Sequence, residues 1–174
     1  INLLCDPGVF LDTLSNLKKN NKWNLGNNWF EENKNKKNEW VNKSLKNLEV
    51  EAEEAKKNGG KIHPLQLSLD IQDAMSEKDW LVIDGGNTHF WSEIAINIAG
   101  AKGKKLGGIL HPGTFSMLGV GVSFALSAKN NNPNSNVILI SGDGAFLSGG
   151  MSIEAAFFEN KPIVVVIDNN GGLA

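Results

Sequence analysis

The sequence predicts a doubly wound α/β domain, in which a parallel sheet carries helices on both faces. Short, continuously apolar runs such as 80–84 and 137–141 are typical of strands buried on both faces of a parallel sheet. These runs alternate with segments of helical periodicity, which is the order that a doubly wound sheet requires. With 174 residues, of which 41% are hydrophobic, the chain is long enough for one such domain and part of another.

Each element is predicted from local signals. Helices are expected where apolar residues recur every three to four positions, and strands where short runs are apolar throughout. Glycine, asparagine and proline residues mark the turns between them. The expected strands lie at 1–5, 80–84, 106–110, 137–141 and 163–168, and the expected helices at 9–19, 39–57, 63–75, 91–99, 116–128 and 150–159.

Three segments are expected along the chain. Residues 1–20 are expected to form a βα unit, with Asp6 as the helix N-cap and Cys5 as a buried apolar side chain. Residues 21–60 are expected to be a linker and a charged, solvated helix, and the Trp-rich part of this segment to pack over a domain surface. Residues 61–174 form the main domain, which we expect to be truncated at its C-terminus. Because the chain does not begin with Met and stops soon after an apolar strand, we expect it to be cut at both ends.

The composition disfavours several classes of protein. A net charge of −2 disfavours a protein that binds nucleic acid through phosphate contacts. No run approaches the roughly 18 apolar residues of a membrane span, and no signal peptide is recognisable, so a cytoplasmic protein is expected. The single cysteine rules out an internal disulfide. Since arginine is absent, a bound phosphate must be held by backbone N–H groups, lysine or a metal.

Three polar, glycine-rich turns follow predicted strands, at 84–88, 141–146 and 168–172. In open parallel sheets, ligands bind at the carboxyl ends of the strands. We therefore expect the three turns to line one crevice.

The last two of these turns carry oxygen ligands. Asp143 offers a carboxylate, Asn170 offers an amide oxygen, and the turn at 171–172 offers a backbone carbonyl, a set that suits Mg²⁺. The N–H groups of Gly144 and Ala145 precede a helix and can face a phosphate. A single glycine-rich turn of this kind more often has no function than belongs to a binding site. Two such turns, each after an apolar strand, favour a metal–diphosphate site.

These motifs resemble those of a known enzyme family. The segment Gly142-Asp143-Gly144, followed by 24 residues and then Asn169-Asn170, resembles the signature of thiamine diphosphate-dependent enzymes of the acetolactate synthase-like superfamily. Three stretches are similar to those of 2-hydroxyacyl-CoA lyases and oxalyl-CoA decarboxylases: DGGNT at 84–88, GTFSMLGVG at 113–121 and GDGAFLSGGMSIE at 142–154. The resemblance implies thiamine diphosphate and Mg²⁺ as cofactors, and by the same resemblance residues 1–20 are similar to the end of the middle domain of the family.

The resemblance also implies roles for individual residues. By this comparison Asp143, Asn170 and the carbonyl of Gly172 would ligate Mg²⁺. Leu118 would support the cofactor in a bent conformation, and the carbonyl of Ser116 would accept a hydrogen bond from the amino group of the cofactor. The remaining contacts to the cofactor would come from Asn87, Thr88, Gly142, Gly144 and Ala145.

The implied function is that of the diphosphate-anchoring, C-terminal part of a lyase, decarboxylase or carboligase acting on 2-keto acids or 2-hydroxyacyl thioesters. In the family, an activating glutamate comes from a pyrimidine-binding domain of the same or another subunit. We therefore assign no catalytic residue to this chain, expect it to be inactive alone, and expect the intact protein to be a homo-oligomer.

Two alternatives remain. The first is a non-catalytic or detached subunit that binds the cofactor or a partner. The second is a dinucleotide-binding domain, which is disfavoured because no Gly-x-Gly-x-x-Gly motif opens a helix after the first strand.

Several titratable residues have more than one interpretation. His89 and His111 flank the expected crevice, where a proton-transfer role competes with a structural one. Glu93 and Glu154 are expected to lie on helix faces rather than in the site, and His63 is expected to be structural.

Overall fold

The computed structural model describes residues 4–20, 28–57 and 59–172. The chain consists of two compact units, and the boundary between them lies between Glu39 and Trp40. The first unit holds helix α1 (Pro7–Asn20) and the start of helix α2 (Trp29–Lys57). The carboxylate of Asp6 accepts the backbone N–H groups of Gly8, at 2.9 Å, and of Val9, at 3.1 Å, which confirms the predicted N-cap.

The predicted N-terminal strand is not found among the described residues. Leu4 and Cys5 lie outside any strand, and residues 1–3 of this prediction lie outside the described part of the chain. Cys5 is exposed rather than buried. A strand exists only where a neighbour completes its hydrogen bonds, and the sheet found in the described ranges draws its strands from residues 80–168 alone.

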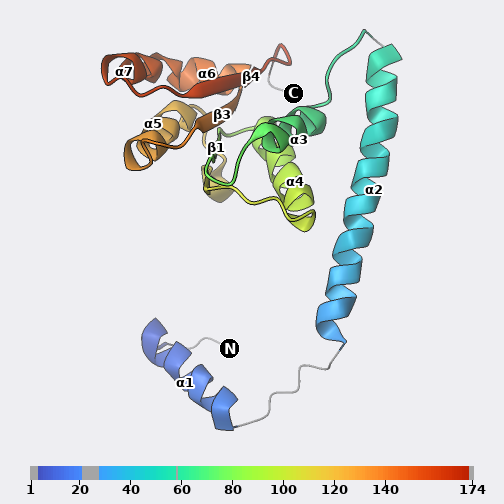
Figure 1. Cartoon of the computed structure of the whole chain (residues 1–174), viewed down its shortest axis with the longest axis vertical. Helices are drawn as coiled ribbons and strands as arrows, with labels where there is room; N and C mark the ends of the chain where they lie inside the picture. Colours follow the sequence, from blue (N-terminus) through green and yellow to red (C-terminus); the bar gives the residue numbers. More distant parts are fainter. Residues whose placement is uncertain (1–3, 21–27, 58, 173–174) are drawn as a thin grey trace. The chain divides into compact units, whose positions relative to one another are not determined.

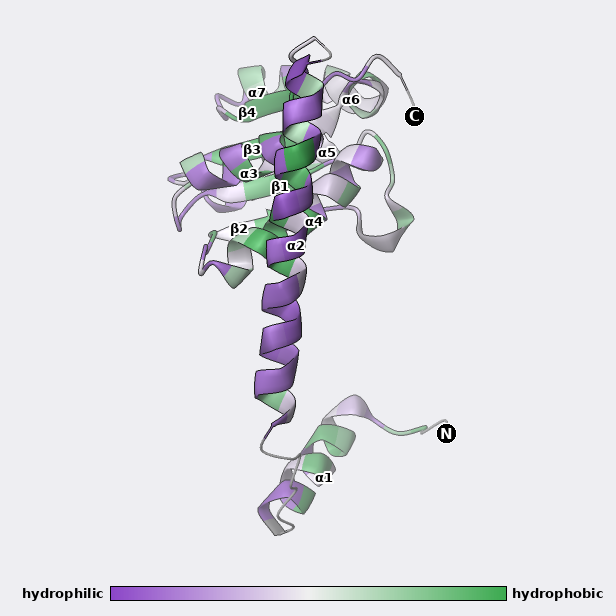
Figure 2. Cartoon of the chain, turned by 90° about the vertical axis from the view of Figure 1, so that its right-hand side faces the viewer, coloured by the Kyte–Doolittle hydropathy of each residue, from purple (hydrophilic) through white to green (hydrophobic). Residues whose placement is uncertain are grey.

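The aromatic residues at the start of α2 belong to the first unit, so the expectation that they pack over a domain surface stays a prediction. Within the structure Trp29 and Phe30 are 62% and 66% exposed, and the helix that they open is hydrophilic over most of its length (Figure 2). Trp40 is also exposed, and Trp23 lies outside the described residues. The later part of α2 was expected to be solvated, but it buries Val41 and Leu48 against the next two helices.

The second unit contains a four-stranded parallel sheet in the order β2-β1-β3-β4; Figure 1 labels β1, β3 and β4, and Figure 2 labels all four strands. Its strands are β1 (Trp80–Ile83), β2 (Gly108–Leu110), β3 (Val137–Gly142) and β4 (Val164–Asp168). In the central register, Val82 lies opposite Leu110 on one side and Leu139 on the other. The register ends with Gly142 beside Asp168, so the turns after β3 and β4 start level with each other.

Helices cover both faces of this sheet. Leu81, Ile83 and Ile140 face helices α3 (Pro64–Ala74) and α4 (Asn87–Ala101), together with Met75. Val82, Val137 and Leu139 face the opposite side, against helix α5 (Gly121–Asn131). These strand residues are at most 1% exposed, as the continuous apolar runs predicted. The predicted doubly wound α/β fold is confirmed.

Helix α5 begins five residues later than predicted. Ser116 and Gly119 have φ values of 46° and 82°, which an α-helix cannot accommodate. Two glycines near the start of α5 lie in close contact with other elements. A Cβ on Gly119 would lie 3.0 Å from the Cβ of Ser148, and one on Gly121 would lie 2.6 Å from the Cδ1 of Leu139.

The helix predicted over 150–159 is broken into shorter pieces that start earlier. Helix α6 (Asp143–Gly149) begins directly at the end of β3, inside the expected turn. A 3₁₀ turn (Gly150–Ser152) and helix α7 (Ile153–Phe158) follow. The break falls at the glycine pair 149–150, since glycine is a poor helix former. In the ranges that the structure describes, no helix is both long enough and apolar enough to cross a membrane.

Asp79, directly before β1, links this edge of the sheet to Asn136, directly before β3. Its carboxylate accepts the backbone N–H of Ser76, at 2.7 Å, and the side-chain amide of Asn136, at 3.0 Å. Burial raises the pKa of this carboxyl, but the hydrogen bonds from Ser76 and Asn136 outweigh it, so that the pKa lies below its ordinary value.

Replacing Asp79 by Asn should destabilise the fold by about 1–2 kcal/mol at neutral pH, because the amide nitrogen cannot accept one of the two hydrogen bonds. A carboxyl with a lowered folded-state pKa stabilises the fold above its unfolded pKa and loses this contribution as the pH falls. The difference between wild type and Asp79→Asn should therefore shrink below about pH 4 in urea unfolding. The control is Asp73→Asn, at an exposed position, and a difference that is constant with pH would contradict this account.

Candidate functional site

A pocket lies at the carboxyl edge of the sheet, where β1, β3 and β4 end. Its volume is about 120 Å³. The turns after these three strands supply its walls, as predicted for 84–88, 141–146 and 168–172. The lining residues are Gly85, Gly86, Asn87, Thr88, Leu118, Gly142, Asp143, Gly144, Ala145, Asp168, Asn170 and Gly172.

The structure brings together all of the predicted site residues except Ser116. The three predicted metal ligands, Asp143, Asn170 and Gly172, line the same pocket. So do the predicted cofactor contacts Asn87, Thr88, Leu118, Gly142, Gly144 and Ala145. The pocket can therefore present carboxylate, amide and backbone groups to one ligand.

The charge of the pocket is negative. Its lining includes two carboxylates, Asp143 and Asp168, and none of its lining residues is a lysine or a histidine. Sequence reasoning missed Asp168, whose Oδ2 lies 3.4 Å from the hydroxyl of Thr88. Its position as the last residue of β4, directly before the two asparagines, is the signal that could have identified it.

The turn after β4 is held by its own side chains. The Oδ1 atom of Asn170 accepts the backbone N–H of Gly172 at 3.2 Å, and the Oδ1 atom of Asn169 accepts that of Gly171 at 3.1 Å. Gly171 has a φ of 78°, which favours glycine. These bonds hold the amide of Asn170 beside the backbone of Gly172, so two of the predicted metal ligands are positioned together. An amide oxygen has two lone pairs, so Asn170 can still bind a cation.

The two glycines that flank Asp143 differ in the space beside them. A Cβ on Gly144 would meet no atom within 4 Å, so this part of the backbone borders open space. A Cβ on Gly142 would instead lie 3.3 Å from the hydroxyl oxygen of Thr88. A ligand can therefore approach the first turn of α6 closely, where the backbone N–H groups have no partner within the helix.

A buried carboxylate outside the pocket connects its walls. Asp84 follows β1 and is 1% exposed. Its Oδ1 atom accepts the backbone N–H groups of Gly119, at 2.9 Å, and Val120, at 3.2 Å, and its Oδ2 atom accepts the hydroxyl of Ser141 at 3.0 Å. Sequence reasoning did not single out this residue, because an acidic residue at a strand end carries no local sign of its partners.

Ser116 lies behind the pocket. Its hydroxyl oxygen accepts the backbone N–H of Gly86 at 2.9 Å. A Cβ on Gly85 would overlap the carbonyl oxygen of Ser116, so the two backbones are in close contact. The hydrogen bond predicted for the Ser116 carbonyl stays a prediction.

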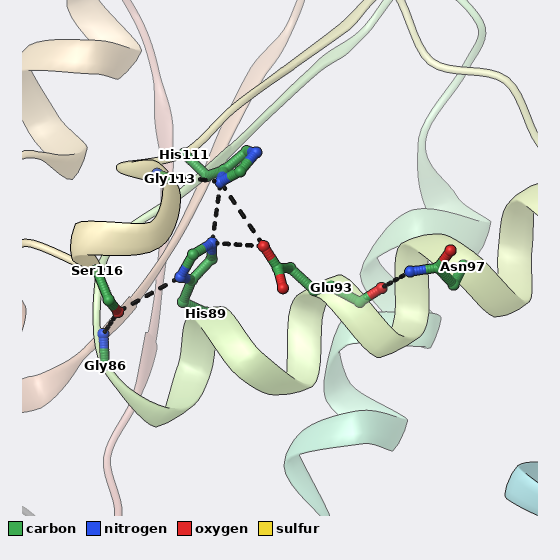
Figure 3. A network of polar contacts seen from close by, with 7 residues as sticks. All are labelled: Gly86, His89, Glu93, Asn97, His111, Gly113 and Ser116. Carbon is green, nitrogen blue, oxygen red and sulfur yellow. Dashed lines mark hydrogen bonds and ion pairs between the residues drawn. The ribbon is translucent and has the colours of Figure 1, made fainter. Parts of the chain in front are cut away.

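The histidines have different surroundings. His63 accepts the backbone N–H of Leu65 at 3.2 Å and caps α3, which confirms its structural role. His89 and His111 meet each other and Glu93 beside Gly86 (Figure 3). Glu93 was expected simply to lie on a helix face, but it also contacts both histidines. Glu154 is exposed and does not line the pocket.

Comparisons with known proteins match the part of the chain that contains the pocket. A family model described as thiamine pyrophosphate enzyme, C-terminal TPP binding domain, matches residues 84–174, just over half of the chain. The chain is 29% identical over 107 residues to mouse 2-hydroxyacyl-CoA lyase 1, 36% over 112 residues to acetolactate synthase large subunit IlvG of Mycobacterium tuberculosis, and 32% over 105 residues to oxalyl-CoA decarboxylase of Escherichia coli.

The matched segments cover 59%, 63% and 59% of this chain, respectively, but 18%, 19% and 18% of the three relatives. The matched part of the chain thus spans less than a fifth of the length of these relatives. The matched family model removes the alternative of a dinucleotide-binding domain and confirms the resemblance found in the motifs.

Removing the Asp84 carboxylate should destabilise the fold by about 3 kcal/mol or more, because several buried donors lose their acceptor at once. In Asp84→Asn, the amide oxygen can still accept the N–H groups of Gly119 and Val120, so the loss should be smaller. Urea unfolding of Asp84→Ala and Asp84→Asn measures the difference. Equal stabilities of the two variants would show that the hydrogen bonds to Asp84 are unimportant.

Proposed function

The chain belongs to the thiamine pyrophosphate enzyme family, and we propose that its pocket binds the diphosphate of thiamine diphosphate through Mg²⁺. The observation that carries this proposal is the charge of the pocket. Asp143 and Asp168 would repel a diphosphate, and no basic side chain of the lining offsets them. A divalent cation between carboxylate and diphosphate removes this repulsion.

The donor set of the pocket fits such an ion. Asp143 would supply a carboxylate oxygen, Asn170 its amide oxygen, and Gly172 its backbone carbonyl. Mg²⁺ prefers oxygen ligands and keeps positions for water and phosphate, which three protein ligands leave free. The diphosphate would contact Asn87, Thr88, Gly142, Gly144 and Ala145, where Gly144 leaves open space.

Thiamine diphosphate supplies the electron sink for cleavage or formation of a carbon–carbon bond when it is bound. The role of this chain would be to hold and orient the cofactor. Leu118 is 38% exposed and lines the pocket. It lies next to Gly86, since a Cβ added to Gly86 would lie 3.3 Å from the Cδ2 atom of Leu118. We infer that Leu118 supports the bent cofactor. No catalytic residue is assigned to this chain.

For the whole protein, we propose a lyase, decarboxylase or carboligase acting on a 2-keto acid or a 2-hydroxyacyl thioester. The similarity to 2-hydroxyacyl-CoA lyase, acetolactate synthase and oxalyl-CoA decarboxylase supports this range of substrates. An activating glutamate would come from a pyrimidine-binding domain, and the chain alone would be inactive. A cytoplasmic location is part of the proposal, in keeping with a chain whose single cysteine cannot form an internal disulfide.

Exposed apolar side chains support a partner for this domain. Large apolar side chains of α6, the 3₁₀ turn and α7 are between 74% and 84% exposed: Leu147, Met151, Phe157 and Phe158. Apolar patches of this kind often mark protein interfaces. We propose that the partner is the pyrimidine-binding domain of the same or another subunit, in a homo-oligomer.

Asp143→Ala should weaken Mg²⁺-dependent binding of thiamine diphosphate by about 100-fold or more while leaving the fold intact, because the proposed ion loses its only charged ligand among the three. Calorimetry measures the affinity, and circular dichroism checks the fold. Glu154→Gln is the matched control, since this exposed acidic residue lies outside the pocket. Unchanged affinity in Asp143→Ala would refute the assignment.

Leu118→Gly, made in the longest native polypeptide that contains this chain, should lower turnover far more than affinity for thiamine diphosphate. A support for the bent conformation acts on the reactive geometry, whereas the diphosphate contacts that set the affinity remain. Steady-state kinetics and calorimetry on the same preparation separate the two effects. Full activity of the variant would argue against this role.

A further inference from the structure

A second group of metal-ligand side chains lies outside the diphosphate pocket. His89 and Glu93 are one helical turn apart on α4, and His111 follows β2 directly. Pairing of β2 with β1 brings His111 to the first turn of α4, so the three side chains point toward one another (Figure 3). None of them lines the pocket assigned to the cofactor.

The spacing of the ligand atoms matches a tetrahedral ion. The Nε2 atom of His89 lies 3.0 Å from the Nδ1 atom of His111 and 3.1 Å from the Oε1 atom of Glu93. The Nδ1 atom of His111 lies 3.8 Å from the same oxygen. In tetrahedral zinc sites with bonds of 2.0–2.1 Å, neighbouring ligand atoms are about 3.3 Å apart. The three atoms thus form a triangle of the right size for one face of such a site.

Hydrogen bonds alone satisfy this triangle poorly. The Nε2 atom of His89 carries at most one proton, which His111 and Glu93 would have to share. The Nδ1 atom of His111 also accepts the backbone N–H of Gly113, at 3.3 Å, so in this arrangement it has no proton to offer Glu93. A cation would interact with all three atoms at once. Binding of the cation would break the hydrogen bond from the backbone N–H of Gly113 to His111, which is long.

The surroundings of His89 suit a metal ligand. Its Nδ1 atom lies 3.4 Å from the hydroxyl oxygen of Ser116. With a metal on Nε2, the proton resides on Nδ1 and can be donated to this oxygen, which has a second lone pair for the N–H of Gly86. Ligating histidines usually donate their other N–H in this manner, which fixes the tautomer and the orientation of the ring.

Access to the site is open from one side. The side chain of His89 is 8% exposed, whereas those of Glu93 and His111 are 49% and 37% exposed. An ion can therefore reach the ligands from solvent, and water can take a fourth position. Two imidazoles and one carboxylate suit Zn²⁺ rather than Mg²⁺.

We propose that His89, Glu93 and His111 bind a Zn²⁺-class transition-metal ion. The ion would link α4 to the segment after β2, and through Ser116 it would restrain Gly86, which lines the diphosphate pocket. This site is independent of the proposed Mg²⁺ site, because the two share no ligand.

The test is calorimetric titration of Zn²⁺ into this chain, with excess Mg²⁺ present and without thiamine diphosphate. One ion should bind with a micromolar or lower Kd. His111→Ala and Glu93→Gln should each weaken binding by about 100-fold. Glu51→Gln is the matched control, because Glu51 pairs with another histidine, His63, at 2.8 Å and supplies no atom of the cluster, so it should leave the affinity unchanged. Bound Co²⁺ should give the visible absorption of a tetrahedral site.

Two results would overturn the proposal: no Zn²⁺ binding by the folded chain, or binding that persists in both His111→Ala and Glu93→Gln. Binding that is lost only in Asp143→Ala would belong to the second case and would place the ion in the pocket instead. Because thiamine diphosphate is omitted, a negative result here leaves the proposed cofactor site untouched, and failure of cofactor binding leaves this proposal standing.

Discussion

The buried carboxylate of Asp84 is the interaction on which the arrangement of the pocket depends. Asp84 follows β1, and its two oxygens accept hydrogen bonds from the loop before α5, at Gly119 and Val120, and from the end of β3, at Ser141. One side chain therefore determines where three parts of the wall lie relative to one another. Its charge is stabilised by several donors at once, which a buried carboxylate needs. Gly121 is required beside it, because a Cβ there would lie 2.8 Å from the Oδ2 atom of Asp84.

The pocket that these hydrogen bonds support is acidic, which is unusual for a site proposed to bind an anion. Its walls combine glycine-rich backbone with the carboxylates of Asp143 and Asp168. Since the chain contains no arginine and the lining contains no lysine, the proposed binding of a diphosphate would be coupled to binding of a divalent cation. The hydrogen bond from the backbone N–H of Gly172 to the side chain of Asn170 would keep two neutral oxygen ligands of the proposed ion in fixed positions.

Much of this was predictable from the sequence, for identifiable reasons. Strands β1, β3 and β4 were located because apolar runs end in polar turns, and Asp143 and Asn170 were found because they follow those strands. The late start of α5 was missed, since hydrophobic periodicity does not reveal the positive φ of Ser116 and Gly119. The partners of Asp84, and the meeting of His111 with His89, depend on strand pairing between distant segments, which no local pattern encodes.

The most direct test of the central claim is the titration of thiamine diphosphate into the longest native polypeptide containing this chain, once with Mg²⁺ and once with a chelator. The account predicts binding with Mg²⁺ and none, or far weaker binding, in the chelator, because the carboxylates of the pocket then face the diphosphate directly. Equal affinity under both conditions would contradict the coupling of cation and diphosphate. No binding by the folded protein under either condition would contradict the assignment of the pocket itself.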